Sequence, residues 1–489
     1  MSDAVAKDDA EGPVSEDVGA TLVRSFRSRS AVYFAADVLV KLFAVGLFLQ
    51  TVQTFGPERF GQLSRVAALL GVAASVGDFG LGMLLLRRVG GLAGGPTLAP
   101  AERRRFVLLR MAMTVLSVLA CVGYLSASGA AYEVVLAAAG GGAGLIVRVF
   151  PDLVGSELRG RGRARADFNI RIFSGISFVV AGLAVVHQGL GVAGFGAAWL
   201  VSAGVAAVVA RVVSREGPSA VGAAAPETDA PAMLRGALPF GILSICMIVY
   251  FRIDTEMVAR MRGDADAGIY GTAYRMFEVC LLLPAAASAA LVPLFAGAFE
   301  RGRLDEVRRL VGDGFRNMAF VGGIGTVLLF GLGPFAIRVL LRDDVGVAAD
   351  VFRVLVWTVP VIFLSSVTSS LIAASTFARV NTRIAVLMVV ENVLLNVVAI
   401  PRWGPAGAAA ATVLTELTGL VINLVVVRRK IGGFTMTSTL ARVAVATVAG
   451  VATSLAIDAW FGPFAGAAAF AAAWYGVSLV QRARRAASA

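Results

Sequence analysis

Residues 132–165 read YEVVLAAAGGGAGLIVRVFPDLVGSELRGRGRAR, and this stretch contains the pattern that decides the fold. Its first part is almost entirely apolar, and its second part carries Arg159, Arg161, Arg163 and Arg165. A helix needs about 20 predominantly apolar residues to cross the hydrocarbon core of a bilayer. The stretch therefore predicts a transmembrane helix that is followed by a basic loop.

Comparable apolar spans recur along the whole chain, and each is about 18–25 residues long. They lie near residues 31–54, 62–86, 106–127, 132–150, 168–187, 189–211, 236–258, 276–298, 317–341, 351–376, 382–400, 405–427, 440–457 and 463–481. The chain is therefore expected to be an all-α integral membrane protein with about 14 transmembrane helices.

The basic residues sort into alternate gaps between these spans. If the spans alternate strictly, about 32 of the 44 Lys and Arg residues fall on one side of the membrane. Basic loops face the cytoplasm, so both termini are expected to be cytoplasmic. Lys is nearly absent while Arg is abundant and Ala, Gly and Val dominate, which is typical of a GC-rich bacterial genome, so a bacterial plasma membrane is expected. The groups include Arg87/Arg88 with Arg103–Arg105, Arg301/Arg303/Arg308/Arg309 and Arg428/Arg429/Lys430.

Composition excludes several classes of protein. Hydrophobic residues make up 58% of the chain and charged residues 16%, outside the range of soluble globular domains. The net charge of +12 is spread over many short loops, which indicates membrane topology and anionic lipid headgroups rather than nucleic acid. Membrane lipids are therefore expected partners, and nucleic acid is not.

Motifs for covalent chemistry are absent from the sequence. There is no G-x-x-x-x-G-K-[ST] loop, no G-x-S-x-G elbow and no C-x-x-C pair. Cys121, Cys246 and Cys280 all fall inside apolar spans, where cysteine behaves as a small apolar residue. We expect no enzyme activity, cofactor or metal. A membrane glycosyltransferase or polymerase is the enzyme alternative, and the short exterior loops argue against it.

The Pro- and Ala-rich stretch between the sixth and seventh spans divides the chain. This stretch is expected to be a cytoplasmic linker between two six-helix bundles. A disordered cytoplasmic tail is expected before the N-terminal bundle, and an added helix pair with a basic end after the C-terminal bundle. The boundaries are residues 1–30, 31–213, 214–234, 235–430 and 431–489. Residues 300–316, with an apolar and a basic face, are expected to form an amphipathic helix on the cytoplasmic surface.

The two bundles carry a weak internal repeat. Gly56 and Gly61 follow the first span, and Gly263 and Gly268 follow the seventh, with a charged turn inside each pair. Six spans separate the two copies, so both have the same orientation in the membrane. The repeat is therefore parallel, and its axis runs along the membrane normal.

Four stretches, in order, resemble the polysaccharide flippases of the multidrug/oligosaccharidyl-lipid/polysaccharide exporter superfamily. The first is FGPERFGQLSRVAALLGVAASVGDFGLG, at residues 55–82. The second is similar to the family's D…G-x-Y-x-x-A-x-R segment, the third to the end of its tenth span, and the fourth to its N…LN…P…G…GAA segment. Together the four stretches extend the resemblance over most of residues 25–430. The second stretch contains Asp254, Gly268, Tyr270, Ala273 and Arg275; the third Leu371–Ala374 and Asn381; the fourth Asn392, Asn396, Pro401, Gly404 and Gly407–Ala409.

The resemblance implies a function and a fold. Such proteins carry lipid-linked oligosaccharides, usually on undecaprenyl diphosphate, from the inner to the outer leaflet for cell-surface polysaccharide biosynthesis. The implied fold is two six-helix bundles around a central cavity, in a monomer. The span count leaves both the O-unit branch and the peptidoglycan-precursor branch open. Cation-coupled multidrug antiport is the alternative, and its cavity would be more apolar or acidic.

Ionisable residues inside the spans are the candidate substrate site. Each costs about 2.5–3.5 kcal/mol on insertion scales, which makes it a functional candidate by default. We expect Lys41, Arg65, Arg252 and Arg275 to meet the diphosphate, because arginine offers bidentate geometry to phosphate oxygens. Structural roles remain open: Arg65 can extend toward the membrane surface, and Arg275 can pair locally with Glu278.

Acidic residues in the spans are candidates for coupling transport to a proton or sodium ion. They are Asp37, Asp254, Glu391 and Glu416. Asp37 and Lys41 are spaced i, i+4 and can also neutralise each other. Asn392 and Asn396 are expected mainly to form hydrogen bonds between helices. The glycan, the driving ion and the orientation of these side chains stay undetermined at this level.

Overall fold

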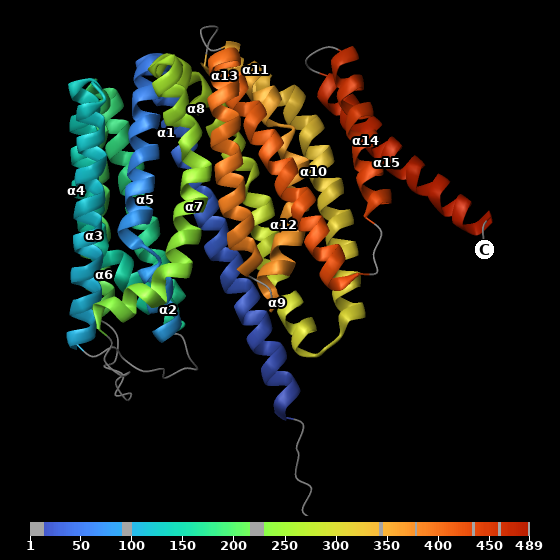
Figure 1. Cartoon of the computed structure of the whole chain (residues 1–489), viewed down its shortest axis with the longest axis horizontal. Helices are drawn as coiled ribbons and strands as arrows, with labels where there is room; N and C mark the ends of the chain where they lie inside the picture. The colour runs from blue at the N-terminus through green and yellow to red at the C-terminus, as the bar shows by residue number, and fades with distance from the viewer. Residues whose placement is uncertain are drawn as a thin grey trace, which may run out of the picture.

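The computed structural model describes residues 14–89, 100–215, 229–341, 346–376, 379–432, 436–457 and 461–487. Side chains are described from Phe43 onward, except at residues 164, 215, 339–341, 379 and 481–487. All regular structure in these ranges is helical (Figure 1). The helices are α1 Val14–Asp78, α2 Leu81–Val89, α3 Pro100–Ala127, α4 Tyr132–Gly160, α5 Ala164–His187, α6 Gly191–Arg215, α7 Ala230–Arg262, α8 Asp264–Cys280, α9 Leu282–Glu300, α10 Leu304–Leu341, α11 Gly346–Leu355, α12 Thr358–Ala374, α13 Arg379–Ile431, α14 Thr437–Ala456 and α15 Gly462–Ala487.

Twelve helical segments among the described residues are long and apolar enough to cross a membrane. Two of them, in α1 and α13, are bent at a glycine whose backbone is not helical. Gly56 has φ 76° and ψ 176°, and Gly404 has φ 57° and ψ −137°. Each of these helices therefore has two legs that match two predicted spans. Counting both legs confirms the all-α fold with about 14 crossings.

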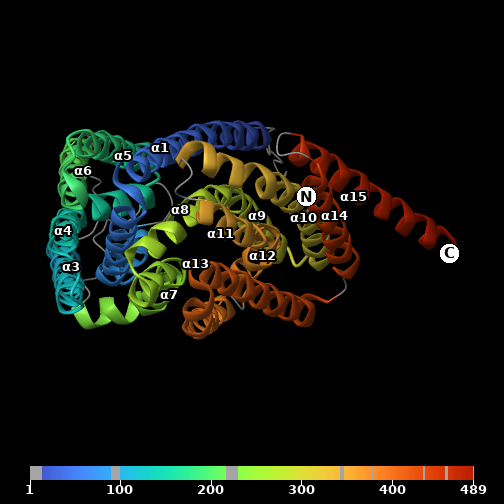
Figure 2. The same cartoon turned by 90° about the horizontal axis from the view of Figure 1, so that it is seen from above.

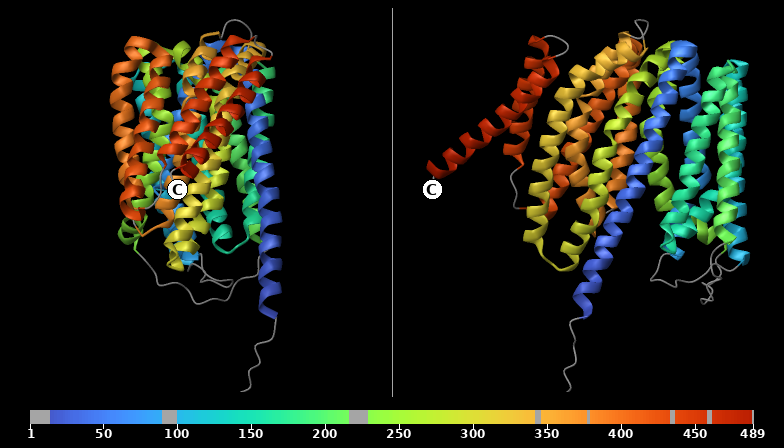
Figure 3. Two further views of the ribbon diagram at one scale, coloured as in Figure 1. Left: turned by 90° about the vertical axis from the view of Figure 1, so that its right-hand side faces the viewer. Right: turned by 180° about the vertical axis from the view of Figure 1, so that it is seen from behind.

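The crossings form two lobes, which are seen side by side in Figure 1. We call α1–α6 the N-lobe and α7–α13 the C-lobe; α14 and α15 pack on α10 at the outer edge of the C-lobe. The view from above in Figure 2 shows α3–α6 of the N-lobe on one side and α9–α13 of the C-lobe on the other, with α8 between them. Helix α1 packs against α7 and α8 across the boundary, and Figure 3 shows its first leg running along that boundary. These lobes are the two predicted bundles.

Two glycines of the predicted repeat, Gly61 and Gly268, form a close contact between the lobes. Gly263 has φ 97° and ψ 169°, nearly the conformation of Gly56 at the matching place in the other lobe. A Cβ on Gly61 would lie 1.7 Å from the carbonyl oxygen of Asp264. A Cβ on Gly268 would lie 1.8 Å from the carbonyl oxygen of Pro57. The contact is reciprocal, as expected where two equivalent helices cross on a shared axis.

One element differs from the sequence-based expectation. Residues 300–316 do not form a separate surface helix, because α10 begins at Leu304 and continues unbroken to Leu341. Val307 and Val311 are fully buried in a cluster with Phe295 of α9 and Leu371 of α12. The apolar face of the segment packs on other helices instead of lying on the membrane surface. Its amphipathic pattern is the same in both situations, so the sequence does not distinguish them.

The predicted tail and linker are only partly described. The expectation of a disordered tail over residues 1–30 is wrong for residues 14–30, which form the start of α1, because the helix continues beyond the apolar span that crosses the membrane. Residues 1–13 and 216–228 are not described, and α1 begins at Val14. Helix α7 begins at Ala230, inside the predicted linker. Its start follows from local sequence: the Asp229 side chain accepts a hydrogen bond from the Ala232 backbone N–H over 3.0 Å, and Pro231 occupies the first turn.

Candidate substrate cavity

A cavity of about 1030 Å³ lies between the two lobes. The N-lobe contributes an apolar wall from both legs of α1 and from the rings of Phe178, Phe195 and Trp199. The C-lobe contributes nearly all of the polar lining, from α7, α8, α9, α12 and α13. An apolar pocket with a few convergent polar groups is the usual form of a ligand site.

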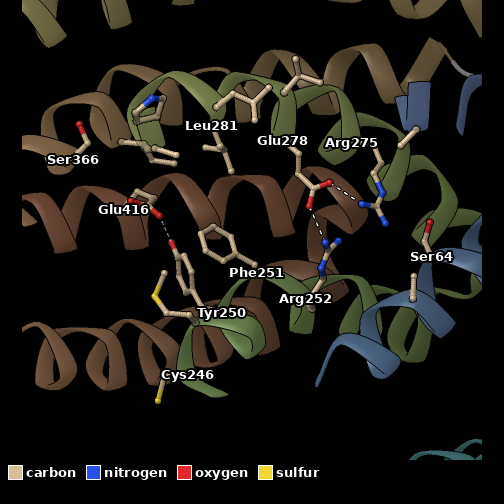
Figure 4. A pocket seen from close by; sticks show the side chains of 18 of the residues that line it. Ser64, Cys246, Tyr250, Phe251, Arg252, Arg275, Glu278, Leu281, Ser366 and Glu416 are labelled. Atoms are coloured by element: carbon tan, nitrogen blue, oxygen red, sulfur yellow. Dashed lines mark hydrogen bonds and ion pairs between the residues drawn. The ribbon is translucent and has the colours of Figure 1, made fainter. Parts of the chain in front are cut away.

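Three charged side chains of α7 and α8 meet on the cavity surface (Figure 4). The Glu278 carboxylate accepts from Arg252 through Oε1 over 3.1 Å and from Arg275 through Oε2 over 2.8 Å. All three side chains are about one-quarter to one-third exposed. One carboxylate thus holds two guanidinium groups side by side, and the group retains one net positive charge when all three side chains are ionised.

A second polar contact on the same surface links α7 to α13. The Tyr250 hydroxyl donates to Oε1 of Glu416 over 2.7 Å (Figure 4). Glu416, one of the predicted coupling residues, is 7% exposed and lines the cavity. Among the described lining residues, Arg252 and Arg275 are the cations and Glu278 and Glu416 the anions.

Asp254 lies in a separate polar cluster inside the C-lobe. It is 2% exposed, and its carboxylate accepts from Tyr270 over 2.9 Å, Thr412 over 3.0 Å and Asn396 over 2.6 Å. Asn396 also donates to Asn392 over 3.1 Å. Within the described part of the chain, no Lys or Arg forms an ion pair with Asp254. The cluster is therefore a buried acidic group surrounded by oxygen and amide atoms, which suits a small cation or a proton.

Arg65 does not line the cavity. Its Nε donates to Glu256 Oε2 over 2.8 Å, and its terminal nitrogen donates to Oε1 over 3.0 Å. The Tyr124 hydroxyl donates to the same Oε1 over 2.6 Å. Arg65 and Tyr124 belong to the N-lobe and Glu256 to the C-lobe. The bidentate pair therefore links the two lobes, close in sequence to the glycine crossing.

The remaining predicted site residues have different surroundings. Glu391 is half-buried on α13 and accepts from Thr418 of the other leg of that helix over 2.7 Å, and it does not line the cavity. Asp37 and Lys41 lie on α1, and their side chains are outside the described residues. The structure thus brings Arg252, Arg275 and Glu416 together on one surface, with Asp254 behind it.

Sequence reasoning overlooked two partners at this site. Glu278 appeared only as a local partner of Arg275, yet it also binds Arg252 on the neighbouring helix. Tyr250 was not singled out, although a tyrosine two residues before Arg252 in a span is a polar signal. Contacts between helices are invisible to spacing along one helix, which is why both were missed.

The sequence pattern of the polysaccharide biosynthesis protein family matches residues 27–299, more than half of the chain. The chain belongs to this family. The pattern of the MatE family also matches residues 239–398. The family assignment agrees with the resemblance noted for the four sequence stretches.

Two proteins of Haloferax volcanii are similar to this chain. The probable flippase AglR is 29% identical over 35% of this chain, and the match spans only 37% of AglR. The probable low-salt glycan biosynthesis flippase Agl15 is 22% identical over 79% of this chain and 80% of its own length.

Solved structures share the fold. The lipid II flippase MurJ in an inward closed conformation superposes with a TM-score of 0.72, at 11% identity, over 92% of this chain and 98% of its own. An inward-facing multidrug resistance MATE transporter has a TM-score of 0.63, at 15% identity, over 81% of this chain and 94% of its own. At these identities the likeness establishes the two-lobed transporter fold alone.

Proposed function

We propose that this protein is a transporter that flips a lipid-linked oligosaccharide from the inner to the outer leaflet of the plasma membrane. Transport proceeds by alternating access and serves cell-surface polysaccharide biosynthesis. The observation that carries the proposal is the pair of arginines on the wall of the cavity between the lobes. Family membership and the names of the two Haloferax relatives support it.

The chemistry of the substrate explains the arginine pair. A diphosphate, such as that of an undecaprenyl carrier, does not cross hydrocarbon unaided, because a charge inside the membrane is costly. Arg252 and Arg275 offer the diphosphate bidentate donors at the cavity wall, while the apolar lipid tail stays outside. Glu278 holds both guanidinium groups in place before substrate binds. Lys41 is a further candidate ligand of the diphosphate.

Alternating access requires the closed end of the cavity to open. The helix crossing at Gly61 and Gly268 and the Arg65–Glu256 pair hold the lobes together at one end. The arginine-rich loops lie at the other ends of the helices, so we propose that the closed end faces the exterior and that both termini are cytoplasmic. Separation of the lobes at the closed end would release the glycolipid to the outer leaflet from a monomeric protein.

Coupling to an ion is proposed for the acidic residues. Asp254 is the strongest candidate, because its buried carboxylate is ringed by hydroxyl and amide groups of α8 and α13. A sodium ion or a proton would neutralise it, and α7 would respond because Asp254 lies two residues after Arg252. Glu416, Glu391 and Asp37 are the further candidates.

Reconstitution into lipid vesicles tests the proposal. Vesicles loaded in both leaflets with a fluorescent polyprenyl diphosphate-linked oligosaccharide would show faster leaflet exchange with the protein than without it. The double variant Arg252→Ala, Arg275→Ala should lose at least about 90% of that rate, because the diphosphate in the cavity is left without its positively charged partners. Equal exchange by the variant and the wild-type protein would contradict the proposed site.

Multidrug antiport is the second candidate function. The MatE match and the largely apolar cavity with Glu416 on its wall favour it, because an apolar pocket with a carboxylate suits organic cations. Uptake of a cationic dye into the same vesicles under a proton or sodium gradient distinguishes the two functions. Dye transport without glycolipid exchange would replace the proposed flippase with an antiporter.

A further inference from the structure

One part of the cavity wall carries neutral hydrogen-bonding groups and no cation among its described residues. It consists of side chains from α9, α12 and both legs of α13, which we call the hydroxyl–amide wall. Figure 4 shows Ser366 of this wall at one end of the pocket and the two arginines at the other. The members are Ser288, Ser365, Ser366, Ser369, Asn381 and Asn423.

The wall presents hydrogen-bond acceptors to the cavity, because the donor hydrogens of Ser366 and Ser369 and one of those of Asn381 are used within the C-lobe. Ser366 Oγ donates to the Phe363 carbonyl over 2.7 Å, and Ser369 Oγ donates to the Ser365 carbonyl over 2.7 Å. Asn381 Nδ2 donates to the Ser369 carbonyl over 3.2 Å. A hydroxyl or amide oxygen keeps lone pairs when the donor hydrogen is used. These oxygens remain free to accept from a ligand.

Asn423 supplies an independent sign of a ligand. Its side chain is 6% exposed and lines the cavity, and its Oδ1 has no hydrogen-bond partner among the described residues. Ser365 Oγ is also buried without a partner. A buried polar atom without a partner costs free energy, so native proteins rarely keep one without a reason. Hydrogen-bond donors on a bound molecule would give Asn423 Oδ1 and Ser365 Oγ the partners they lack.

Charge selects among the molecules that carry such donors. The cations on the described cavity surface, Arg252 and Arg275, already share Glu278. These arginines are distant from the hydroxyl–amide wall: Ser288 lies 13 residues after Arg275, which corresponds to ~20 Å of helix rise along α8 and α9. Glu416 lies two helical turns before Asn423 on the same leg of α13, so both project from a similar side of the helix, and it adds an acidic group to the cavity lining. A carboxylate on a sugar would find no cation among the described residues of this wall, and the Glu416 carboxylate would repel it.

We infer that the hydroxyl–amide wall is a subsite for the neutral sugars of the lipid-linked glycan and that it disfavours acidic sugars. Sugar hydroxyls donate to the serine and asparagine oxygens while the diphosphate lies on Arg252 and Arg275. This inference rests on the proposed flippase function and adds the class of glycan that the cavity accepts.

Binding measurements on the full chain in lipid nanodiscs test the inference with three probes. The probes are a polyprenyl diphosphate without sugar, the same lipid with one glucose, and the same lipid with one glucuronic acid. The wild-type protein should bind the glucose lipid about tenfold more tightly than the sugar-free lipid, and the glucuronic acid lipid no more tightly than the sugar-free lipid.

Three variants separate the wall from the arginines. Asn423→Leu and the double variant Ser366→Ala, Ser369→Ala should abolish the preference for glucose and leave the affinity for the sugar-free lipid unchanged. Arg275→Ala should weaken the binding of all three lipids. Ser177→Ala is the matched control, because Ser177 donates to the carbonyl three residues earlier, as Ser366 does, and does not line the cavity. Its preference should equal that of the wild-type protein.

The failures are distinguishable. If the wild-type protein binds the sugar-free and glucose lipids equally well, the subsite is overturned and the flippase proposal stands. If it prefers the glucuronic acid lipid, the class of glycan is overturned. If it binds none of the three lipids, the proposed function fails and the subsite fails with it. An unchanged glucose preference in both wall variants would also overturn the subsite.

Discussion

At the scale of single residues, the two arginines of the cavity are organised by one shared carboxylate. Glu278 binds Arg252 of the preceding helix and Arg275 of its own helix. Without a partner, two guanidinium groups this close would repel each other and turn away. With it, both guanidinium groups stay on the cavity wall and lose some of their attraction for a phosphate. Glu278 therefore keeps the two arginines in place when the site is empty, and it lowers the affinity of the site for a phosphate.

Replacing Glu278 by Gln should raise that affinity. The side chain keeps its size and loses its charge, so both arginines become available to the diphosphate. We expect the dissociation constant of the sugar-free polyprenyl diphosphate to fall about three- to tenfold and leaflet exchange to slow, because release becomes harder. Titration in nanodiscs measures the first effect. Asp313→Asn, which removes an exposed i, i+3 pair with Arg316, is the control and should change neither quantity. Weaker binding by Glu278→Gln would contradict this role.

Asp254→Asn should uncouple transport from the driving ion. The amide fits the hydrogen-bonded cluster of Tyr270, Thr412 and Asn396. It carries no negative charge, so it does not need a cation to neutralise it. We expect the glycolipid to bind as before, while acceleration of exchange by a sodium or proton gradient falls at least about tenfold, because the neutral amide attracts a cation far less than the carboxylate does. Vesicles with an imposed gradient, compared with vesicles at equilibrium, measure this. A variant that still responds fully to the gradient would remove Asp254 from the coupling mechanism.

At the scale of elements, glycine permits the second leg of α1 and α8 to cross. The two backbones approach so closely that any side chain at Gly61 or Gly268 would overlap a carbonyl group of the opposite helix. The positive φ of Gly56 and Gly263 turns the chain sharply into each of these helices. The same two positions in each lobe thus determine both the turn and the contact.

Gly61→Ala should therefore force the two helices apart. Overpacking of this kind costs about 1–3 kcal/mol, and we expect a lower thermal midpoint in detergent together with slower leaflet exchange. Gly123→Ala in α3 is the control, because a Cβ there meets nothing within 4 Å and alanine is the better helix former. Its midpoint should stay equal or rise. A Gly61→Ala protein as stable and active as the control would contradict the close crossing.

At the scale of the whole molecule, the Arg65–Glu256 pair links the lobes through a buried contact. Both side chains are about 7% exposed, so neither finds water while the lobes are together. Removing one partner of a buried pair costs about 3–5 kcal/mol, since it leaves an uncompensated charge. Once the lobes separate, both groups are hydrated and the cost disappears. The pair is thus strong in the closed arrangement and dispensable in the open one.

Glu256→Gln should shift the population toward separated lobes. Spin labels at the exposed positions Tyr132 of the N-lobe and Met261 of the C-lobe report the distance across the closed end. We expect a longer-distance component in the variant that is minor in the wild-type protein. Arg262→Gln, which removes an exposed pair with Asp266 inside the C-lobe, should leave the distribution unchanged. Identical distributions in Glu256→Gln and the wild-type protein would mean that the pair does not hold the lobes.

The membrane class, the spans and the glycine repeat were predictable because each depends on local sequence. A run of apolar residues requires a hydrocarbon environment whatever it packs against, and a glycine pair at equivalent positions is visible in one dimension. Segment 300–316 shows the limit of such patterns. Its amphipathic face was recognised, but whether lipid or protein covers that face depends on neighbouring helices.

The sequence by itself determined that this chain crosses the membrane many times and that it carries a few costly charges inside the spans. Only the tertiary structure decided how those charges are shared. Arg65 pairs with Glu256 across the lobes, at 191 residues' separation, while Arg252 and Arg275 turn to the cavity and share Glu278. The physical reason is that the cost of burying a charge is a property of the residue, whereas its compensation is a property of whichever helix lies beside it.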